Sequence, residues 1–143
     1  MKVLIDTNVL LDVFLARPGL CESSTAIWSL AEKEKIHACV SAISFNNVHY
    51  IAMRYHSREL ADEAVATMRD SFKCVDQTMQ IINQSIDAKW KDFEDTIQFF
   101  STVHAEADII ITRNVGDFPK EGMAVMNPED FITFAESKLF NDE

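Results

Sequence analysis

The chain has 143 residues, which suits a single domain large enough to bury a hydrophobic core. Hydrophobic residues make up 48% of the chain and charged residues 25%, as in ordinary globular proteins. The net charge of −10 argues against nucleic-acid binding through Lys and Arg alone. Two explanations for the excess acid stay open, because clustered acids bind divalent cations and scattered acids only maintain solubility.

We expect one cytoplasmic domain spanning residues 1–143, without a membrane segment. No apolar run approaches the roughly 18 residues that a membrane span needs, and Asp6 comes too early for a signal peptide. The three cysteines, Cys21, Cys39 and Cys74, form no Cys-x-x-Cys pair. We therefore expect them to be buried free thiols of a reducing compartment.

Short apolar strands alternate with amphipathic helices along the chain. In chain order the pattern predicts a strand at residues 3–5, helices at 7–15 and 23–33, a strand at 36–40, helices at 44–55 and 58–70, a strand at 72–75, a helix at 79–88, a helix from 92, strands at 109–111 and 124–126, and a last helix from Pro128. This order indicates an α/β fold with a central parallel sheet.

Two of these elements carry a strong hydrophobic pattern. The uninterrupted Ile109-Ile110-Ile111 predicts a parallel strand buried on both faces. In the helix at 79–88, Ile82 and Ile86 are spaced for one face. The helix from 92 has one predicted apolar stripe, which consists of Phe93, Ile97, Phe100 and His104.

Polar residues gather where ligands bind an open parallel sheet, at the carboxyl ends of its strands. They occur in three segments: Asp6-Thr7-Asn8 after the first strand, Asp92 to Asp95 at the start of a helix, and Thr112 to Asp117 after the isoleucine strand. Each segment alone is explained by helix capping or a polar turn. Together, their carboxylates repel one another unless a cation lies among them. Such oxygen ligands suit Mg²⁺ or Mn²⁺, which can activate water against a phosphate.

The strings LIDTNVLLD at residues 4–12, DFED at 92–95 and ITRNVGDF at 111–118 resemble, in this order, the PIN domain. The similarity extends over nearly the whole chain. It implies a three-layer α/β/α sandwich around a parallel sheet of about five strands. It also implies endonuclease activity on single-stranded RNA with Mg²⁺ or Mn²⁺. Many small members are toxins of VapBC-type toxin–antitoxin pairs, often dimeric, each held inactive by a cognate antitoxin.

The resemblance also assigns roles to particular residues. Asp6, Asp95 and Asp117 match the catalytic acids, and the same three with Asn114 match the metal ligands. The predicted supporting residues are Asn8, Asn47, Asp92 and Thr112. Lys91, Arg113 and Lys120 are the nearest cations, and we expect phosphate contacts from Lys91 and Arg113.

The sequence departs from the family pattern at one position. Most active members carry a glutamate in the helix after the second strand, and here Asn47 takes its place. Its carbonyl oxygen can contact a metal or its water, but the amide brings no negative charge. We interpret the chain as part of a subgroup with this asparagine.

The sequence leaves three functions open. The first is a metal-dependent ribonuclease with an antitoxin partner, dimerising through apolar residues between Tyr50 and Met68. The second is a catalytically impaired module that binds RNA or protein, suggested by Asn47. The third is an aspartate-nucleophile phosphotransferase of the haloacid-dehalogenase type, which would need an Asp where Asn8 stands.

Overall fold

The computed structural model describes residues 1–119 and 122–141, without the side chains of 140 and 141. Five strands form one parallel sheet in the order β3-β2-β1-β4-β5. They are β1 (Lys2–Ile5), β2 (His37–Ser41), β3 (Lys73–Val75), β4 (Ile109–Ile111) and β5 (Ala124–Met126). The predicted α/β/α architecture with a five-stranded parallel sheet is thereby confirmed.

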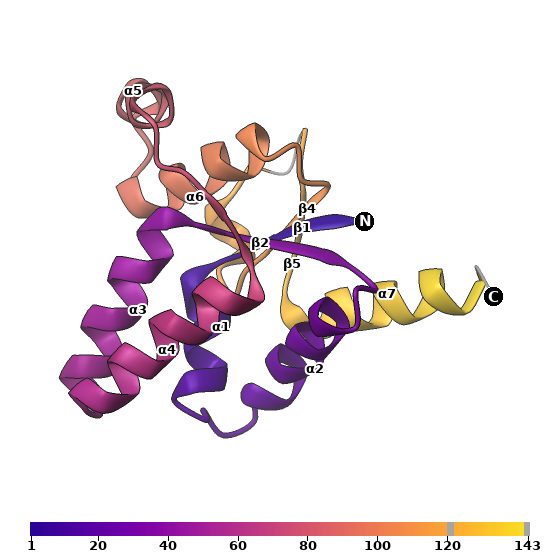
Figure 1. Cartoon of the computed structure of the whole chain (residues 1–143). Helices are drawn as coiled ribbons and strands as arrows, with labels where there is room; N and C mark the ends of the chain where they lie inside the picture. The colour runs from indigo at the N-terminus through magenta and orange to yellow at the C-terminus, as the bar shows by residue number, and fades with distance from the viewer. Residues whose placement is uncertain (120–121, 142–143) are drawn as a thin grey trace.

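Helices cover both faces of this sheet (Figure 1). They are α1 (Thr7–Phe14), α2 (Cys21–Glu32), α3 (Ala42–Tyr55), α4 (Arg58–Ser71), α5 (Met79–Ala88), α6 (Phe93–His104) and α7 (Pro128–Asn141), with a 3₁₀ turn, η1, at Val115–Asp117. The larger core lies on the face covered by α1, α2, α4 and α7. The smaller core lies on the opposite face, under α6.

The central strand β1 and its neighbour β4 are buried on both faces. Val3 and Ile5 point into the larger core while Leu4 points into the smaller one. Ile109, Ile110 and Ile111 alternate in the same way and are at most 4% exposed. This confirms the interpretation of the isoleucine run, since only a strand with helices on both sides buries every side chain.

The predicted apolar stripe of α6 is wrong. Phe93 is 48% exposed, and the buried side of the helix carries Asp95, Thr96, Ile97, Gln98, Ser101 and Thr102. Hydrogen bonds stabilise much of this polar face: Ser101 Oγ donates to Ser41 Oγ (3.2 Å), and Gln98 Nε2 donates to Ser44 Oγ (2.9 Å), although the buried Gln98 Oε1 has no partner among the described residues. Hydrogen bonding therefore overrides the apolar periodicity in this helix.

Smaller predictions also differ from the structure. Ile86 of α5 is 55% exposed, because Ile81 and Ser85 form the buried face instead. Cys74 is exposed and only Cys39 is fully buried. Met68 is fully buried in the larger core and is unavailable to a dimer surface. Within residues 1–119 and 122–141, none of the helices has the length and apolar character of a transmembrane segment.

A buried ion pair ties α1 to the segment after β4. Asp12 is fully buried, and its Oδ2 accepts hydrogen bonds from Arg113 Nε (2.8 Å) and Ser24 Oγ (3.0 Å). The Arg113 guanidinium also reaches Glu129 Oε1 on α7 (2.7 Å). Because α1 begins directly after Asp6, this network fixes the helix that follows the first strand.

We expect Asp12→Ala to lower the free energy of unfolding by about 3 kcal/mol, because Arg113 loses the buried partner of its charge. Urea denaturation measures the change. The control is Asp70→Ala, which removes an exposed ion pair with Arg69 and should leave stability nearly unchanged. An equally small change in both variants would contradict a structural role for the Asp12 network.

Candidate metal centre

Strands β1 and β4 end side by side, and the chain beyond each strand stays in register. Ile5 pairs with Ile111. The next residue, Asp6, donates its backbone N–H to Ile111 O (2.9 Å), and Thr112 donates to Met126 O (2.9 Å). Asp6 and Thr112 therefore occupy neighbouring places at the carboxyl edge of the sheet, as the sequence predicted.

The Asp6 carboxylate is buried and held from both sides. Its side chain is 1% exposed; Oδ1 accepts a hydrogen bond from Thr7 N (2.7 Å) and Oδ2 from Thr112 Oγ1 (2.7 Å). Thr112 Oγ1 in turn accepts from Asn114 N (3.0 Å). Asp6 caps α1, so the capping interpretation is correct, and the same bonds fix the orientation of its carboxylate.

The start of α6 brings further acids to this edge. Asp92 is the N-cap of α6, and its Oδ1 accepts a hydrogen bond from Asp95 N (3.0 Å). The first turn then carries Glu94 and Asp95. Asp92, Glu94 and Asp95 each place one carboxylate oxygen within 4.8 Å of the others, a spacing that can hold a metal ion.

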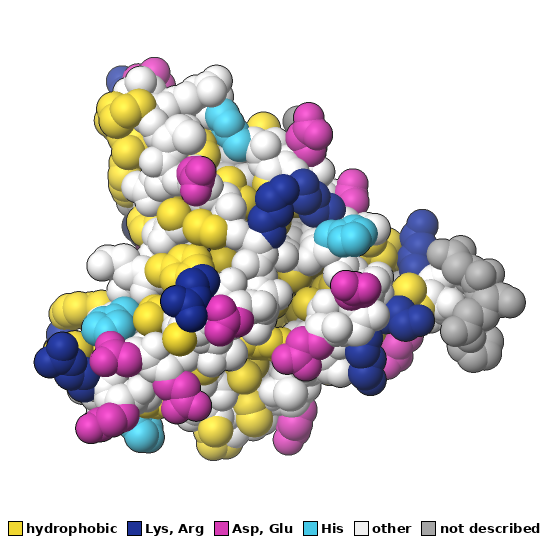
Figure 2. All heavy atoms as spheres, viewed as in Figure 1, with side chains coloured by type: hydrophobic (Ala, Val, Ile, Leu, Met, Phe, Trp, Pro, Cys, Tyr) yellow, Lys and Arg dark blue, Asp and Glu magenta, His cyan; other side chains and the backbone are white. Residues whose placement is uncertain are grey.

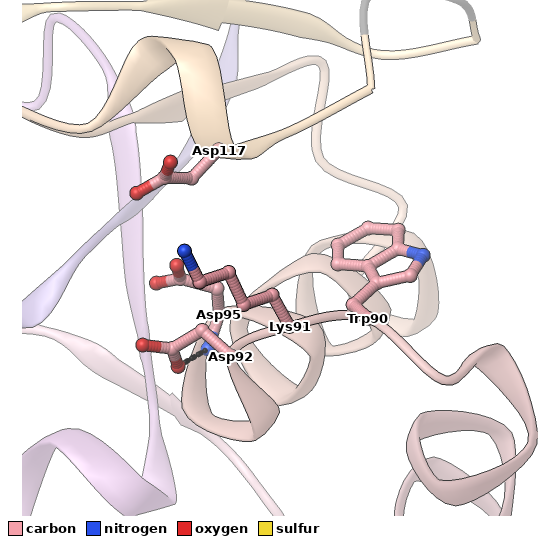
Figure 3. Close-up of a pocket in the computed structure, with 5 residues that line it drawn as sticks. All are labelled: Trp90, Lys91, Asp92, Asp95 and Asp117. Atoms are coloured by element: carbon pink, nitrogen blue, oxygen red, sulfur yellow. Dashed lines mark hydrogen bonds between the residues drawn. The ribbon is translucent and has the colours of Figure 1, made fainter.

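Two adjoining cavities contain most of the predicted site residues. The first is lined by Asp6, Thr7, Asn8, Asn47, Tyr50, Ile51, Asp92, Glu94, Asp95 and Asn114. The second has a volume of about 400 Å³ and is lined by Trp90, Lys91, Asp92, Asp95 and Asp117 (Figure 3). Asp92 and Asp95 belong to both cavities, so segments far apart in sequence contribute to one acidic depression.

Burial and mutual repulsion raise the pKa values of Asp6 and Asp95, the two most buried acids of the cavities. Burial first, and then the Glu94 carboxylate, raise the pKa of Asp6 to about 7, against the hydrogen bonds from Thr112 and Thr7. Burial also raises the pKa of Asp95 to about 7, with the carboxylates of Asp92, Asp6, Glu94 and Asp117 adding to the shift. The ionised forms of these carboxylates are therefore destabilised, and a bound proton or cation stabilises the site.

The predicted phosphate contacts differ in where their charges lie. Lys91 lines the second cavity, and Figure 3 shows its side chain extending over Asp95 toward Asp117. Arg113 lines neither of these two cavities, since its guanidinium is engaged by Asp12, Glu129 and Leu20 O. Lys120 lies outside the described residues. On the face in Figure 2, Lys and Arg alternate with Asp and Glu, and among the described residues they form no continuous basic surface there.

Five cavity-lining residues were not among the predicted site residues: Thr7, Tyr50, Ile51, Trp90 and Glu94. Glu94 was noted only as part of the acidic helix start, and its spacing of four from Gln98 is the signal that could have singled it out. Trp90 packs against Phe99 with ring centroids 5.1 Å apart while also lining the second cavity. Tyr50 lines the first cavity although it is 60% exposed. No sequence signal distinguishes these two aromatic residues from core residues.

The α/β/α sandwich and the buried acids at the carboxyl edge of its sheet define the class of this protein. A comparison with known sequence families gives the same class. The model of the PIN domain family matches residues 2–116. The chain therefore belongs to the PIN domain family. No curated protein sequence matches it significantly.

Solved structures of distant sequence share this fold. One is VapBC2 from Rickettsia felis bound to a promoter DNA fragment, with a TM-score of 0.69, 12% identity, and coverage of 89% of this chain and 98% of that one. A toxin–antitoxin complex from Klebsiella pneumoniae has a TM-score of 0.65 at 23% identity, covering 88% and 97%. VapC20 from Mycobacterium tuberculosis, a sarcin–ricin loop cleaving toxin, has a TM-score of 0.63 at 13% identity, covering 76% and 86%. At sequence identities of 12–23%, the similarity to these structures establishes the fold alone.

The raised pKa values predict how stability depends on pH without divalent cations. In the folded chain Asp6 and Asp95 keep protons that the unfolded chain loses above about pH 4, so stability from these groups falls as pH rises from about 4 to 7. We therefore expect Asp95→Asn to raise the free energy of unfolding in EDTA at about pH 8 and to change it little at about pH 4.

Urea denaturation at the two pH values measures this difference. The control is Asp70→Asn, because Asp70 is exposed and precedes β3 at the opposite end of the strands. The control should show no such gain at the higher pH. A gain for Asp95→Asn that is the same at both pH values would show that the charge on the buried Asp95 carboxylate is not its origin.

Proposed function

We propose that this protein is an endoribonuclease that cleaves single-stranded RNA with Mg²⁺ or Mn²⁺. The observation that carries the proposal is the buried carboxylate of Asp6, which shares a cavity with Asp95 and Glu94. Burial and, to a lesser extent, repulsion between carboxylates raise the pKa values of Asp6 and Asp95, so a bound cation would offset the cost of charging both acids. Membership of the PIN domain family supports the same reading.

The side chains present suit a small, hard cation. They offer carboxylate oxygens from Asp6, Asp92 and Asp95 and an amide oxygen from Asn114, all lining one cavity. Mg²⁺ and Mn²⁺ prefer such oxygen ligands, whereas neither His nor Cys, which would favour zinc, lines this cavity. Bound there, the cation would activate a water and stabilise charge on the scissile phosphate.

The residues around the cavity then take distinct roles. Thr112 and Thr7 hold the Asp6 carboxylate at a fixed angle, so that it binds without reorganisation. Asp95 and Asp117 complete the catalytic acids, and Asn114 supplies a neutral oxygen. Lys91 lines the second cavity, and we assign it a contact with an RNA phosphate. Asn8, Asp92 and Asn47 support this arrangement.

We further propose that the protein acts in the cytoplasm as the toxin of a toxin–antitoxin pair. Support comes from the fold neighbours, two of which are described as toxin–antitoxin or VapBC complexes and a third as a sarcin–ricin loop cleaving toxin. A cognate antitoxin is the partner expected on this basis. The exposed Tyr50, Met53 and Tyr55 of α3 provide apolar surface for a homodimer.

A second function is favoured by Asn47. The residue lines the first cavity without bringing a charge, which suits a member that binds RNA or a protein partner without cleaving it. Cleavage separates the two functions, because a binding module would retain RNA in a gel-shift assay and leave it intact with either metal.

We expect purified protein to cleave single-stranded RNA in Mn²⁺ or Mg²⁺, and Asp6→Asn or Asp95→Asn to lower the rate at least about 100-fold, as loss of a catalytic acid does in other enzymes. Gel analysis of a labelled RNA measures the rate. Circular dichroism of each variant verifies the fold.

The exposed Asp70→Asn variant serves as the control and should cleave at the wild-type rate. EDTA should abolish cleavage, and added Mn²⁺ should restore it. Cleavage that survives EDTA, or that persists in Asp6→Asn, would contradict the proposed function.

A further inference from the structure

The side chain of Asn47 contacts an acidic side chain of the site. Its Nδ2 donates a hydrogen bond to Glu94 Oε1 on the facing helix α6 (3.2 Å). The same Glu94 oxygen accepts from Gln98 Nε2 (2.9 Å) and from Thr7 Oγ1 (3.2 Å). Residues on three helices, α1, α3 and α6, thus donate hydrogen bonds to this one carboxylate oxygen of Glu94.

We propose that Glu94 supplies the carboxylate that Asn47 lacks, so that this chain carries the acid on α6 instead of α3. The inference rests on the proposed cation-dependent function. Under it, the cation site keeps its full charge, and Asn47 becomes a positioning residue that orients Glu94 through its amide N–H.

The placement of the two Glu94 oxygens supports a role toward the cavity. Oε1 takes all three hydrogen bonds, and Oε2 accepts none from the residues that the structure describes. Glu94 is only partly buried and lines the cavity together with Asp6 and Asp95. A carboxylate held by one oxygen and open at the other is pre-organised to meet a cation.

Charge complementarity explains why an amide stands at position 47. A glutamate there would bring a second carboxylate to the place where Asn47 now contacts Glu94 at 3.2 Å, and two like charges at that distance repel. An asparagine donates a hydrogen bond instead. The Asn47 and Glu94 side chains are therefore a matched pair.

A purely structural role for Glu94 is the competing account. Gln98 is fully buried, and its Nε2 bonds Ser44, Thr7 and Glu94, so Glu94 could serve only as an acceptor in this polar network. Glutamine at position 94 keeps an acceptor oxygen and the side-chain shape but removes the charge. The substitution therefore separates the two roles.

Isothermal titration of the full chain with Mn²⁺ tests the proposal without relying on activity. We expect Glu94→Gln to weaken Mn²⁺ binding by about 10–100-fold while its circular dichroism spectrum stays that of the wild type. The double variant Glu94→Gln/Asn47→Glu should recover most of this loss, because it returns the charge to α3. Glu136→Gln, on the exposed side of α7, is the matched control and should bind as the wild type does.

Unchanged Mn²⁺ binding in Glu94→Gln would overturn the proposal, as would a loss that Asn47→Glu fails to recover. Asp6→Asn distinguishes this failure from that of the proposed function. If Asp6→Asn binds Mn²⁺ like the wild type, the cation site itself is refuted; if it does not bind and Glu94→Gln is unaffected, only the role of Glu94 is refuted.

Asn47→Glu alone keeps the proposal testable if Glu94→Gln does not fold. We expect this variant to melt at a lower temperature than the wild type in EDTA and to regain the wild-type melting temperature in excess Mn²⁺, because the cation screens the two adjacent carboxylates. Melting unchanged from the wild type in EDTA would overturn the proposal.

Discussion

Repulsion between carboxylates at the carboxyl edge of the sheet is the constraint on which the site depends. Asp6 and Asp95 are buried there, and Glu94 and Asp92 each place a carboxylate oxygen within 4.8 Å of one on Asp95. Burial first, and then repulsion from the neighbouring carboxylates, raises the pKa values of Asp6 and Asp95, which is the free-energy cost of this arrangement. A divalent cation bound among these carboxylates, as proposed above, would remove this cost.

The surrounding structure holds these acids in place against their repulsion. Thr7 and Thr112 fix Asp6, while Gln98 and Ser44 join α6 to α3 beneath the cavity. Behind the site, Arg113 is engaged by Asp12 and Glu129 instead of by the cavity acids. The polar residues therefore form two groups. The acids of the Asp12 network are paired with Arg113, whereas the cavity acids have no arginine partner among the described residues.

The sequence predicted the fold well because the strands in the middle of the sheet carry short apolar runs, Val3 to Ile5 in β1 and Ile109 to Ile111 in β4. It also placed Asp6, Asp95 and Thr112 at one edge, since parallel strands end together. It failed on α6, where the buried face is polar: periodicity of apolar residues cannot reveal that Gln98 and Ser101 find partners on α3 and at the end of β2.

Tertiary contacts also changed the meaning of two site residues. Arg113 follows directly on Thr112, yet its side chain turns to Asp12, 101 positions earlier in the chain. From the sequence alone, Asn47 indicates a missing negative charge. Only the folded chain shows that Glu94 lies beside it. Side-chain direction at a site depends on such distant partners, which no local pattern contains.

The most direct measurement is a crystal structure of the protein grown with Mn²⁺, with the ion located from its anomalous scattering. The account predicts one strong peak bonded to the carboxylates of Asp6 and Asp95, with Glu94 facing the ion directly or through a water. A peak elsewhere on the molecule, or none at a concentration that supports RNA cleavage, would contradict it.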